Sequence, residues 1–460
     1  MASLGGALYL GHEAGLQDSA PAALLDAGPG LATLDLRALL SNPRSADQRM
    51  LDIAFRQVEK AFYRPVNAQL LLNGEQHELL AYLKKHKISD PAIPSALATG
   101  DEAHDVRLLN RNLQLAQSQY GRQTSNAELT QAAISGMLNA LGDPYTAYLS
   151  AREISSLEES LKGGDFGGIG VYIVQDPQTK QVLVEPIEGT PAFLAGIKTG
   201  DQILAVDGHH VGGLKLDDVE RLIRGRSGTV VQLVVRAHGA PAARTIAVTR
   251  SQIVVPSVKA EMEDGFEYVR LSDFGSNSYD EVRRAMLDGK AHNAKGYILD
   301  LRNNGGGLLE AAVQISSLFI PQGTIVSTID REGNTEVKTA THESIGAAPL
   351  VVLVNKYTAS ASEITAGAVQ DYHVGALIGV KTFGKGVVQS IYNLSDGGAL
   401  KITTARYVTP LGRDIQHKGI VPDVVVNQSP AIIGTIRDLG TAKDLQLAAA
   451  KSYLRRIAHR

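Results

Sequence analysis

The most constraining feature of the chain is a strand, a serine-rich elbow, a helix and a second strand in close succession. Residues 350–354 and 376–380 are short apolar runs, and about twelve residues of helical character lie between them. A unit of this kind folds with parallel strands and a right-handed connection. It places Ser360 and Lys385 at one edge of the sheet and leaves His373 at the far end of the helix. The sequence predicts an α/β sheet with a serine and a lysine side by side.

A glycine loop is expected at the same edge. Residues 296–301 form another apolar run, followed by RNNGGG and a helical pattern from Leu308. Consecutive glycines leave N–H groups uncovered, and a helix N-terminus adds positive potential. We expect the amides of Gly306 and Ala361 to stabilise a developing oxyanion.

The chemistry that these parts support is acyl transfer by a serine and a neutral lysine. Lys385 must lose its proton to act as a base, so its ordinary pKa of about 10.4 has to fall. Burial among apolar residues lowers the pKa of an amine. We expect Phe383, Val387 and Val388 to supply the apolar surroundings, and Gln389 to hydrogen-bond the amine.

Two residues of the elbow allow a structural as well as a functional interpretation. Ser360 also fits a helix N-cap among small residues. Glu363, one helical turn later, fits either an N-terminal carboxylate stabilised by the helix dipole or a group of the site itself.

The motifs NKYTASASEITAGAVQD, TFGKGVVQ and DLRNNGGG together resemble the C-terminal processing peptidases, also called tail-specific proteases. The resemblance implies that Ser360 is the nucleophile, Lys385 the general base and Gln389 the residue that supports it. The family loop usually reads N-P-G-G, and Gly305 stands here in place of the proline. This substitution makes the loop more flexible and weakens the assignment of Gly306.

A second block, residues 163–250, resembles a PDZ domain. FGGIGV precedes short alternating strands, and PAFLAGIKTGDQIL supplies the short helix, turn and hairpin of that fold. The resemblance implies that backbone amides of the glycine loop bind a substrate's terminal carboxylate. Its residues are Gly167, Gly168, Ile169 and Gly170. Arg224 matches a family position that links peptide binding to activation.

Composition excludes several other classes of protein. The 460 residues include no cysteine, which removes thiol catalysis and cysteine-bound zinc. The twelve histidines contain no H-E-x-x-H, so we expect neither metal nor cofactor. A net charge of −3 gives no reason to expect nucleic acid as a partner.

The expected fold is α/β and multidomain: a helical N-terminal domain, a PDZ-like domain and an α/β protease core. Residues 67–118 depart from the family pattern and read as an insertion, either a cap or an oligomer contact. The apolar stretch near the start is too short to span a membrane and reads as the remnant of an export signal or anchor. The expected boundaries are 1–45 (linker), 46–162 (helical), 163–250 (PDZ-like), 251–430 (core) and 431–460 (C-terminal helix).

The sequence therefore predicts an exported serine endopeptidase that binds disordered C-terminal tails and is gated by its PDZ-like domain. Its partners would be protein or peptide substrates, with an adaptor protein and a homo-oligomer also compatible with the family. Two alternatives remain: a non-catalytic scaffold that uses only the PDZ-like domain, and an acyl-thioester enzyme with a similar oxyanion site.

Overall fold

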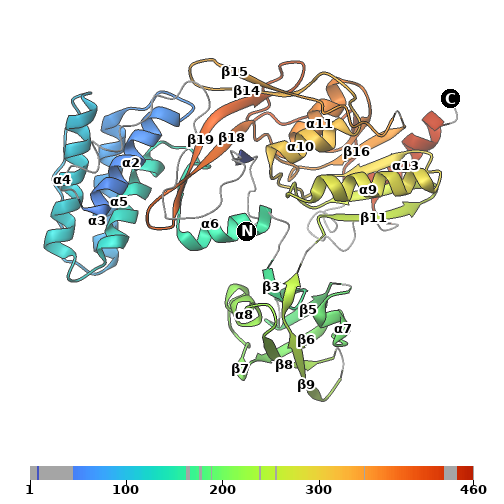
Figure 1. The fold of residues 1–460 in the computed structure, drawn as a ribbon, viewed down its shortest axis with the longest axis horizontal. Coiled ribbons are helices and arrows are strands. Elements are labelled where there is room, and N and C mark those ends of the chain that lie inside the picture. The colour runs from blue at the N-terminus through green and yellow to red at the C-terminus, as the bar shows by residue number, and fades with distance from the viewer. Residues whose placement is uncertain are drawn as a thin grey trace, which may run out of the picture. The chain divides into compact units, whose positions relative to one another are not determined.

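The computed structural model describes residues 8–9, 45–161, 166–175, 179–187, 189–237, 240–253, 256–346, 348–428 and 443–458. These residues form two compact units, whose elements are labelled in Figure 1. The first unit combines residues up to 155 with 260–274 and the chain from 285 onward. The second holds residues 156–259 and 275–284. Most of the expected linker, 1–45, lies outside the described residues.

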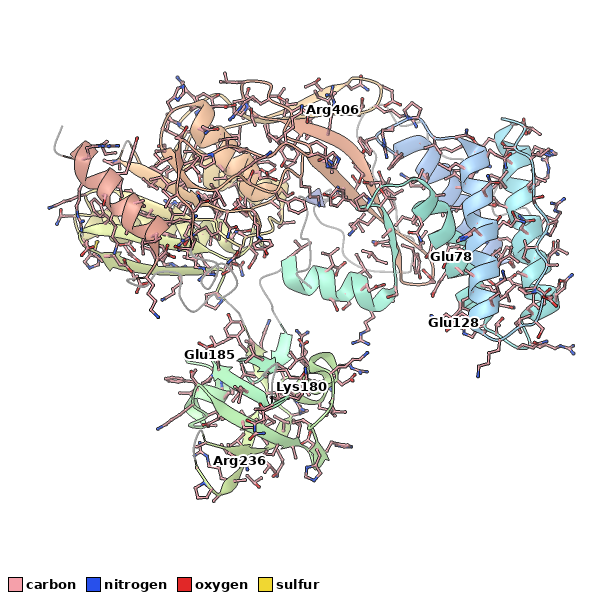
Figure 2. The ribbon with its side chains drawn as sticks, turned by 180° about the vertical axis from the view of Figure 1, so that it is seen from behind. Glu78, Glu128, Lys180, Glu185, Arg236 and Arg406 are labelled. Atoms are coloured by element: carbon pink, nitrogen blue, oxygen red, sulfur yellow. The ribbon has the colours of Figure 1, made fainter. Side chains whose placement is uncertain are left out.

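The N-terminal part of the first unit is helical, as its periodicity predicts. Side chains of the predicted stripe, among them Leu51 and Phe55, are fully buried. The Ser125 side chain caps the last helix of this part by accepting from the amide of Glu128, and Tyr82 donates to the Glu128 carboxylate over 2.6 Å. Glu128 lies on the helical part of the molecule, where Figure 2 labels it. The helices are α2 (Ala46–Ala61), α3 (Ala68–Lys85), α4 (Glu102–Tyr120) and α5 (Asn126–Ala140).

The core of the first unit contains a largely parallel sheet in the order β11-β12-β13-β16-β17-β20. The predicted apolar runs form its centre, because strands covered on both faces carry continuous apolar side chains. The strands are β11 (Val258–Glu263), β12 (Phe266–Leu271), β13 (Tyr297–Asp300), β16 (Leu350–Val354), β17 (Ala376–Gly379) and β20 (Val424–Val425).

Helices connect these strands and cover the sheet. α10 and α11 pack against each other, and α13 buries Leu447, Ala450 and Leu454 against one face of the sheet (Figure 1). The helices are α9 (Ser278–Ala291), α10 (Leu309–Ser317), α11 (Ala361–Asp371) and α13 (Leu445–Ala458).

A second sheet of the first unit has the order β1-β18-β19-β14-β15, with β2 paired to β19. Its long hairpin, β18 and β19, follows the lysine loop directly. A shift in register between Val388 and Gln389 interrupts that hairpin. The strands are β1 (Leu8–Tyr9), β2 (Ala147–Leu149), β14 (Thr324–Ile329), β15 (Thr335–Thr339), β18 (Val387–Asn393) and β19 (Ala399–Val408).

The second unit is a small β domain around its own apolar core. Its sheet has the order β4-β5-β6-β8-β9, with β7 paired to β6 and β3 paired to β10. The helices are α6 (Ala151–Leu161), which begins in the first unit, α7 (Pro191–Leu194) and α8 (Leu216–Ile223). The strands are β3 (Phe166–Gly168), β4 (Val171–Gln175), β5 (Val182–Pro186), β6 (Asp201–Val206), β7 (His209–His210), β8 (Val230–Arg236), β9 (Ala243–Thr249) and β10 (Ser251–Ile253).

Among the helices within the described ranges, none is long and apolar enough to cross a bilayer.

Candidate active site

The elbow after β16 places Ser360 in a backbone conformation that L residues rarely adopt. Its φ and ψ are 59° and −117°, and its side chain is fully buried. Such strain persists only where surrounding contacts impose it, and it is concentrated at functional sites. The carbonyl oxygen of Ser360 accepts the amides of Glu363 and Ile364 at 2.7 and 2.9 Å, which starts α11 directly beyond the serine.

One carboxylate connects the elbow to the lysine loop. Oε2 of Glu363 accepts the amides of Ser360 and Lys385, each at 2.9 Å, so these two nitrogens lie at most twice that distance apart. Oε1 accepts the Gly384 amide at 2.8 Å and the Thr382 hydroxyl at 2.5 Å. Glu363 thus fits both interpretations, because it caps α11 through the Ser360 amide and also binds the lysine loop.

The hydroxyl of Tyr407 makes a second connection between the same two segments. It lies 2.6 Å from the carbonyl oxygen of Lys385 and 3.1 Å from that of Ser360. Tyr407 is fully buried, and burial raises its pKa, so it remains a donor across the ordinary pH range. Sequence reasoning missed it, because a tyrosine in an alternating strand carries no functional signal of its own.

The side chain of Lys385 is buried, with 1% of its surface exposed. Loss of hydration, and then the charge of Lys401, lowers its pKa to about 7, while Asp143 and Glu363 act in the opposite direction. At this pKa a large fraction of the amine is neutral near pH 7.

The apolar surroundings of Lys385 differ in part from those expected. Val387 and Val388 are buried as expected, whereas Phe383 is 40% exposed. The ring of Tyr145, from the turn after α5, lies beside the amine, with its centroid 4.3 Å from Nζ. A packed tyrosine 240 residues earlier in the chain could not be assigned to this position from local pattern.

Gln389 is buried at the start of the β18–β19 hairpin. Its Nε2 donates to Oγ1 of Thr403 over 3.3 Å, a partner that the sequence did not suggest. That hydroxyl in turn donates to Asp143, over 2.6 Å. Thr403 and Asp143 were missed, and the only available signal was the DPYT turn after a capped helix.

The glycine loop packs directly on the elbow. Gly306 has φ of 102°, and a Cβ at this position would lie 2.9 Å from Ala359 O, Ala361 N and Ser360 Cβ. Asn304 joins the two segments, because its carbonyl accepts the Ala359 amide at 3.0 Å and its Oδ1 accepts the Gly306 amide at 2.9 Å. The expected oxyanion donor at Gly306 therefore already has an acceptor in this structure.

A buried ion pair supports the start of this loop. Arg302 contacts Asp300 at the end of β13 and Asp444 just before α13, at 2.6 and 2.7 Å, with all three side chains fully shielded from solvent. Arg302 also donates to Gln446 over 3.1 Å. The C-terminal segment is thus held beside the loop that follows β13.

The glycine loop of the second unit precedes a strand with one neighbour only. Among the described strands β4 pairs with β5 alone, and α8 packs beside it. Gly170 has φ of 73°, and a Cβ there would clash with Thr190, so the turn requires glycine. Of the four residues expected in this loop, Gly167 and Gly168 lie in β3 and pair with β10, and Ile169 and Gly170 lie between β3 and β4. Arg224 ends α8 and pairs with Glu220 of the same helix.

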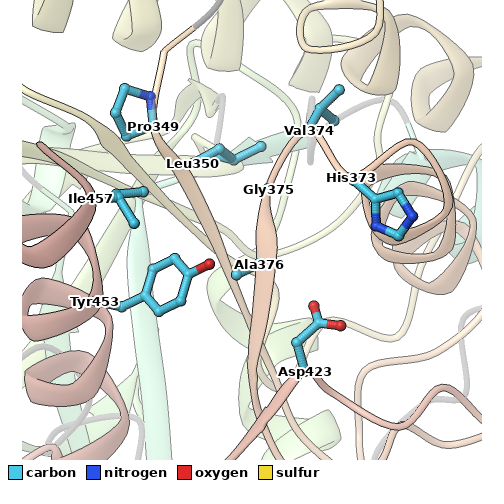
Figure 3. Close-up of a pocket in the computed structure, with 9 residues that line it drawn as sticks. All are labelled: Pro349, Leu350, His373, Val374, Gly375, Ala376, Asp423, Tyr453 and Ile457. Atoms are coloured by element: carbon cyan, nitrogen blue, oxygen red, sulfur yellow. The ribbon is translucent and has the colours of Figure 1, made fainter. Parts of the chain in front are cut away.

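A pocket of about 270 Å³ lies at the opposite, amino edge of the parallel strands, as Figure 3 shows. Leu350 and Ala376, which begin β16 and β17, form part of its wall, whereas Ser360 follows the other end of β16. The pocket is therefore separate from the serine and lysine. Its lining comprises Pro349, Leu350, His373, Val374, Gly375, Ala376, Asp423, Tyr453 and Ile457.

Comparison with known families matches three parts of the chain. Residues 266–426 match peptidase family S41, residues 182–237 a PDZ domain, and residues 73–153 the N-terminal domain of the activating protease CtpB. The last match runs through most of residues 67–118, and so gives no support to an insertion there.

Individual relatives agree with these matches. A carboxyl-terminal-processing protease of Synechocystis sp. is 38% identical over 84% of this chain and 90% of its own length. Carboxy-terminal processing protease CtpA of Bacillus subtilis is 38% identical over 71% of this chain and 70% of its own. Among solved structures, a photosystem II D1 C-terminal processing protease is 31% identical, covers 84% of this chain and 94% of its own, and has a TM-score of 0.47.

Proposed function

Because the chain belongs to the carboxyl-terminal-processing proteases, serine peptidases with a PDZ domain, we propose that it cuts protein tails with Ser360 and Lys385. The observation that carries this proposal is the pair of hydrogen bonds through which Glu363 holds the elbow and the lysine loop together. The burial of Lys385 supports the same assignment, since it supplies a neutral amine near pH 7.

The proposed reaction begins with proton transfer from the Ser360 hydroxyl to the neutral amine of Lys385. The oxygen attacks the scissile carbonyl, and the amides of Ala361 and Gly306 stabilise the oxyanion, the latter by exchanging Asn304 for the substrate. The lysine returns the proton to the leaving amine, and an acyl-enzyme ester remains. Water, deprotonated by the same lysine, hydrolyses that ester and frees the carboxyl product.

Tail recognition is assigned to the PDZ-like block. A substrate tail would add as a strand beside β4, with its carboxylate on the amides of Gly167, Gly168, Ile169 and Gly170. The exposed side chains of Tyr172 and Val174 on β4 would flank that added strand. We propose that Arg224, at the end of the helix beside β4, transmits peptide binding to turnover.

The test is digestion of a disordered peptide that ends either in a free carboxylate or in an amide, with products identified by mass spectrometry. We expect wild type to cut the free-acid peptide more efficiently, and Ser360→Ala and Lys385→Ala to cut neither. Lys381→Ala removes an exposed lysine four residues earlier and serves as the matched control. Full cleavage by Lys385→Ala would overturn the dyad, and equal cleavage of both peptides would overturn tail recognition.

Location and assembly follow from the family resemblance alone. We propose that the protein acts outside the cytoplasm on substrates with disordered C-termini, with an adaptor or a second copy as further partners. Fractionation of cells that express the tagged chain tests the location. Recovery in the cytoplasm alone would contradict it.

A further inference from the structure

We infer that Asp143 and Thr403 form a positioning pair that orients the Gln389 carboxamide toward the catalytic lysine; this inference rests on the Ser-Lys mechanism proposed above. The pair joins the N-terminal helical part of the first unit to its protease core. Its members lie 260 residues apart in the chain and are connected over 2.6 Å.

The first step of the argument is the environment of Asp143, which is 7% exposed. Its Oδ2 accepts two hydroxyl groups, those of Thr146 and Thr403, at 2.6 Å each. The hydroxyl oxygen of Thr146 also accepts the backbone amide of Thr403, at 3.0 Å. The turn after α5 thereby fixes both the backbone and the side chain of Thr403.

The turn is held in this place by the sheet. Strand β2 follows it directly and pairs antiparallel with β19, with Ala147 opposite Lys401. Thr403 lies two residues further along β19, on the same face as Lys401. The positions of Asp143 and Thr146 are therefore set by strand pairing as well as by their hydroxyl contacts.

The second step is the direction of the hydrogen bonds. A threonine hydroxyl has one proton, and Thr403 donates it to the carboxylate of Asp143. Toward Gln389 the hydroxyl can only accept, so the carboxamide turns its Nε2 to Thr403, at 3.3 Å. That leaves the carboxamide oxygen as the atom we assign to the Lys385 amine, in the supporting role that the sequence suggested for Gln389.

The third step is the register of the hairpin. Gln389 and Thr403 are cross-strand partners, immediately after the register shift between Val388 and Gln389. Such irregularities redirect a side chain at functional sites. Without the hydroxyl of Thr403, a buried carboxamide would lack the partner that selects one of its two orientations.

The fourth step is the charge around Lys385. Lys401 of β19 lowers the pKa of the amine, and Asp143 and Glu363 raise it. The rings of Tyr145 and Tyr407 are the other titratable groups near it, and burial raises the pKa of both. Burial lowers the pKa of the half-buried Lys401 and Asp143 opposes that shift, so this one carboxylate acts on both amines.

The hydroxyl is tested by Thr403→Val, which has the same shape but no hydrogen bond to Gln389. We expect kcat on a tail peptide to fall about tenfold with KM unchanged, and Thr403→Ser to restore it. Thr404→Val is the matched control, because Thr404 is the next residue of β19 and contacts Ser390 instead. A kcat for Thr403→Val equal to that of wild type would overturn the positioning role.

The charge is tested separately by Asp143→Asn, whose amide oxygen still accepts both hydroxyls. Loss of the carboxylate lowers the pKa of Lys385, so the acid limb of the kcat/KM profile should move to lower pH. An acid limb at the same pH as in wild type would contradict the effect of the Asp143 charge on the pKa of Lys385.

Lys385→Ala separates the two proposals. If that variant retains full activity, the dyad itself fails. If it is inactive while Thr403→Val and Asp143→Asn match wild type in kcat and pH profile, the positioning pair alone fails.

Discussion

Ser360 and Lys385 donate their backbone amides to one and the same oxygen atom, Oε2 of Glu363, at 2.9 Å each. The carboxylate is fully buried and accepts two further donors through Oε1. One buried carboxylate therefore holds the elbow and the lysine loop together.

Replacement of this carboxylate by an amide should disconnect the site. In Glu363→Gln one acceptor oxygen becomes an NH₂ group, which faces amide donors and cannot bond them. We expect kcat to fall by at least about tenfold, measured on a tail peptide together with fluorophosphonate labelling of Ser360. Glu310→Gln, in the first turn of α10 and exposed, is the control. Wild-type kcat in Glu363→Gln would contradict this reading.

Activity should rise with pH through about 7. The pKa of Lys385 is lowered to about 7 by burial and by Lys401, and only the neutral amine accepts the serine proton. A profile of kcat/KM against pH checks this expectation. Lys385→Arg keeps the charge at every accessible pH and should be inactive throughout. A flat profile between pH 5 and 9 is incompatible with the lysine as base.

The same burial should make Lys385 costly for stability. Its pKa is lower in the folded than in the unfolded chain, so this group lowers the free energy of unfolding most below pH 7, and that penalty shrinks as the pH rises toward the unfolded value. Lys385→Met removes the cost of burying a charged amine, and the free energy of unfolding at pH 7 should increase by up to about 5 kcal/mol. Urea unfolding at pH 7 and at pH 10 measures it. If the stabilisation by Lys385→Met were larger at pH 10 than at pH 7, the pKa of Lys385 would not be lowered by folding.

Substitution of Gly306 should affect catalysis through geometry. In Gly306→Ala the new methyl group meets backbone atoms of Ala359 and Ala361 at 2.9 Å, and φ of 102° is strained for alanine. A shift of the elbow of this kind costs about a hundredfold in kcat. Gly333→Ala has φ of 86° and open space around it, so it carries the backbone strain without the clash. Equal losses in the two variants would assign the effect to strain alone.

The C-terminal ion pair should matter for folding. Asp444→Ala leaves the buried Arg302 with one of its two carboxylates, and loss of a buried partner typically costs about 3 kcal/mol or more. Arg455→Ala breaks an exposed pair with Asp264 and should cost less than about 1 kcal/mol. The midpoints of denaturant unfolding for the two variants measure these two stability costs. A cost for Asp444→Ala as small as that of the control would contradict the supporting role.

The sequence predicted the parts of the fold that depend on local pattern. Strand β16 was expected at its observed bounds, and β13 and β17 within one or two residues, because continuous apolar runs between polar turns indicate buried parallel strands. The predicted placement of Ser360 and Lys385 at one edge agrees with the contacts of Glu363. Family membership and the PDZ domain were confirmed by the comparisons.

The contacts that could not be predicted join segments distant in the chain. Tyr145 and Tyr407 contact Lys385, and Asp143 contacts Thr403, through strand pairing that no local periodicity encodes. Phe383 was expected to enclose the amine because it is apolar and adjacent, but adjacency in a loop does not fix the direction of a side chain. The roles of Gln389, Gly306 and Arg224 stay predictions.

The ion pair between Arg302 and Asp444 has a consequence for how the protein is made. Asp444 is translated after every strand described here, and α13 follows it. While the chain is still emerging from the ribosome, Arg302 lacks this partner and the sheet lacks the cover of α13. Until Asp444 has left the ribosome, the growing chain therefore carries a partly neutralised Arg302 beside the loop that follows β13.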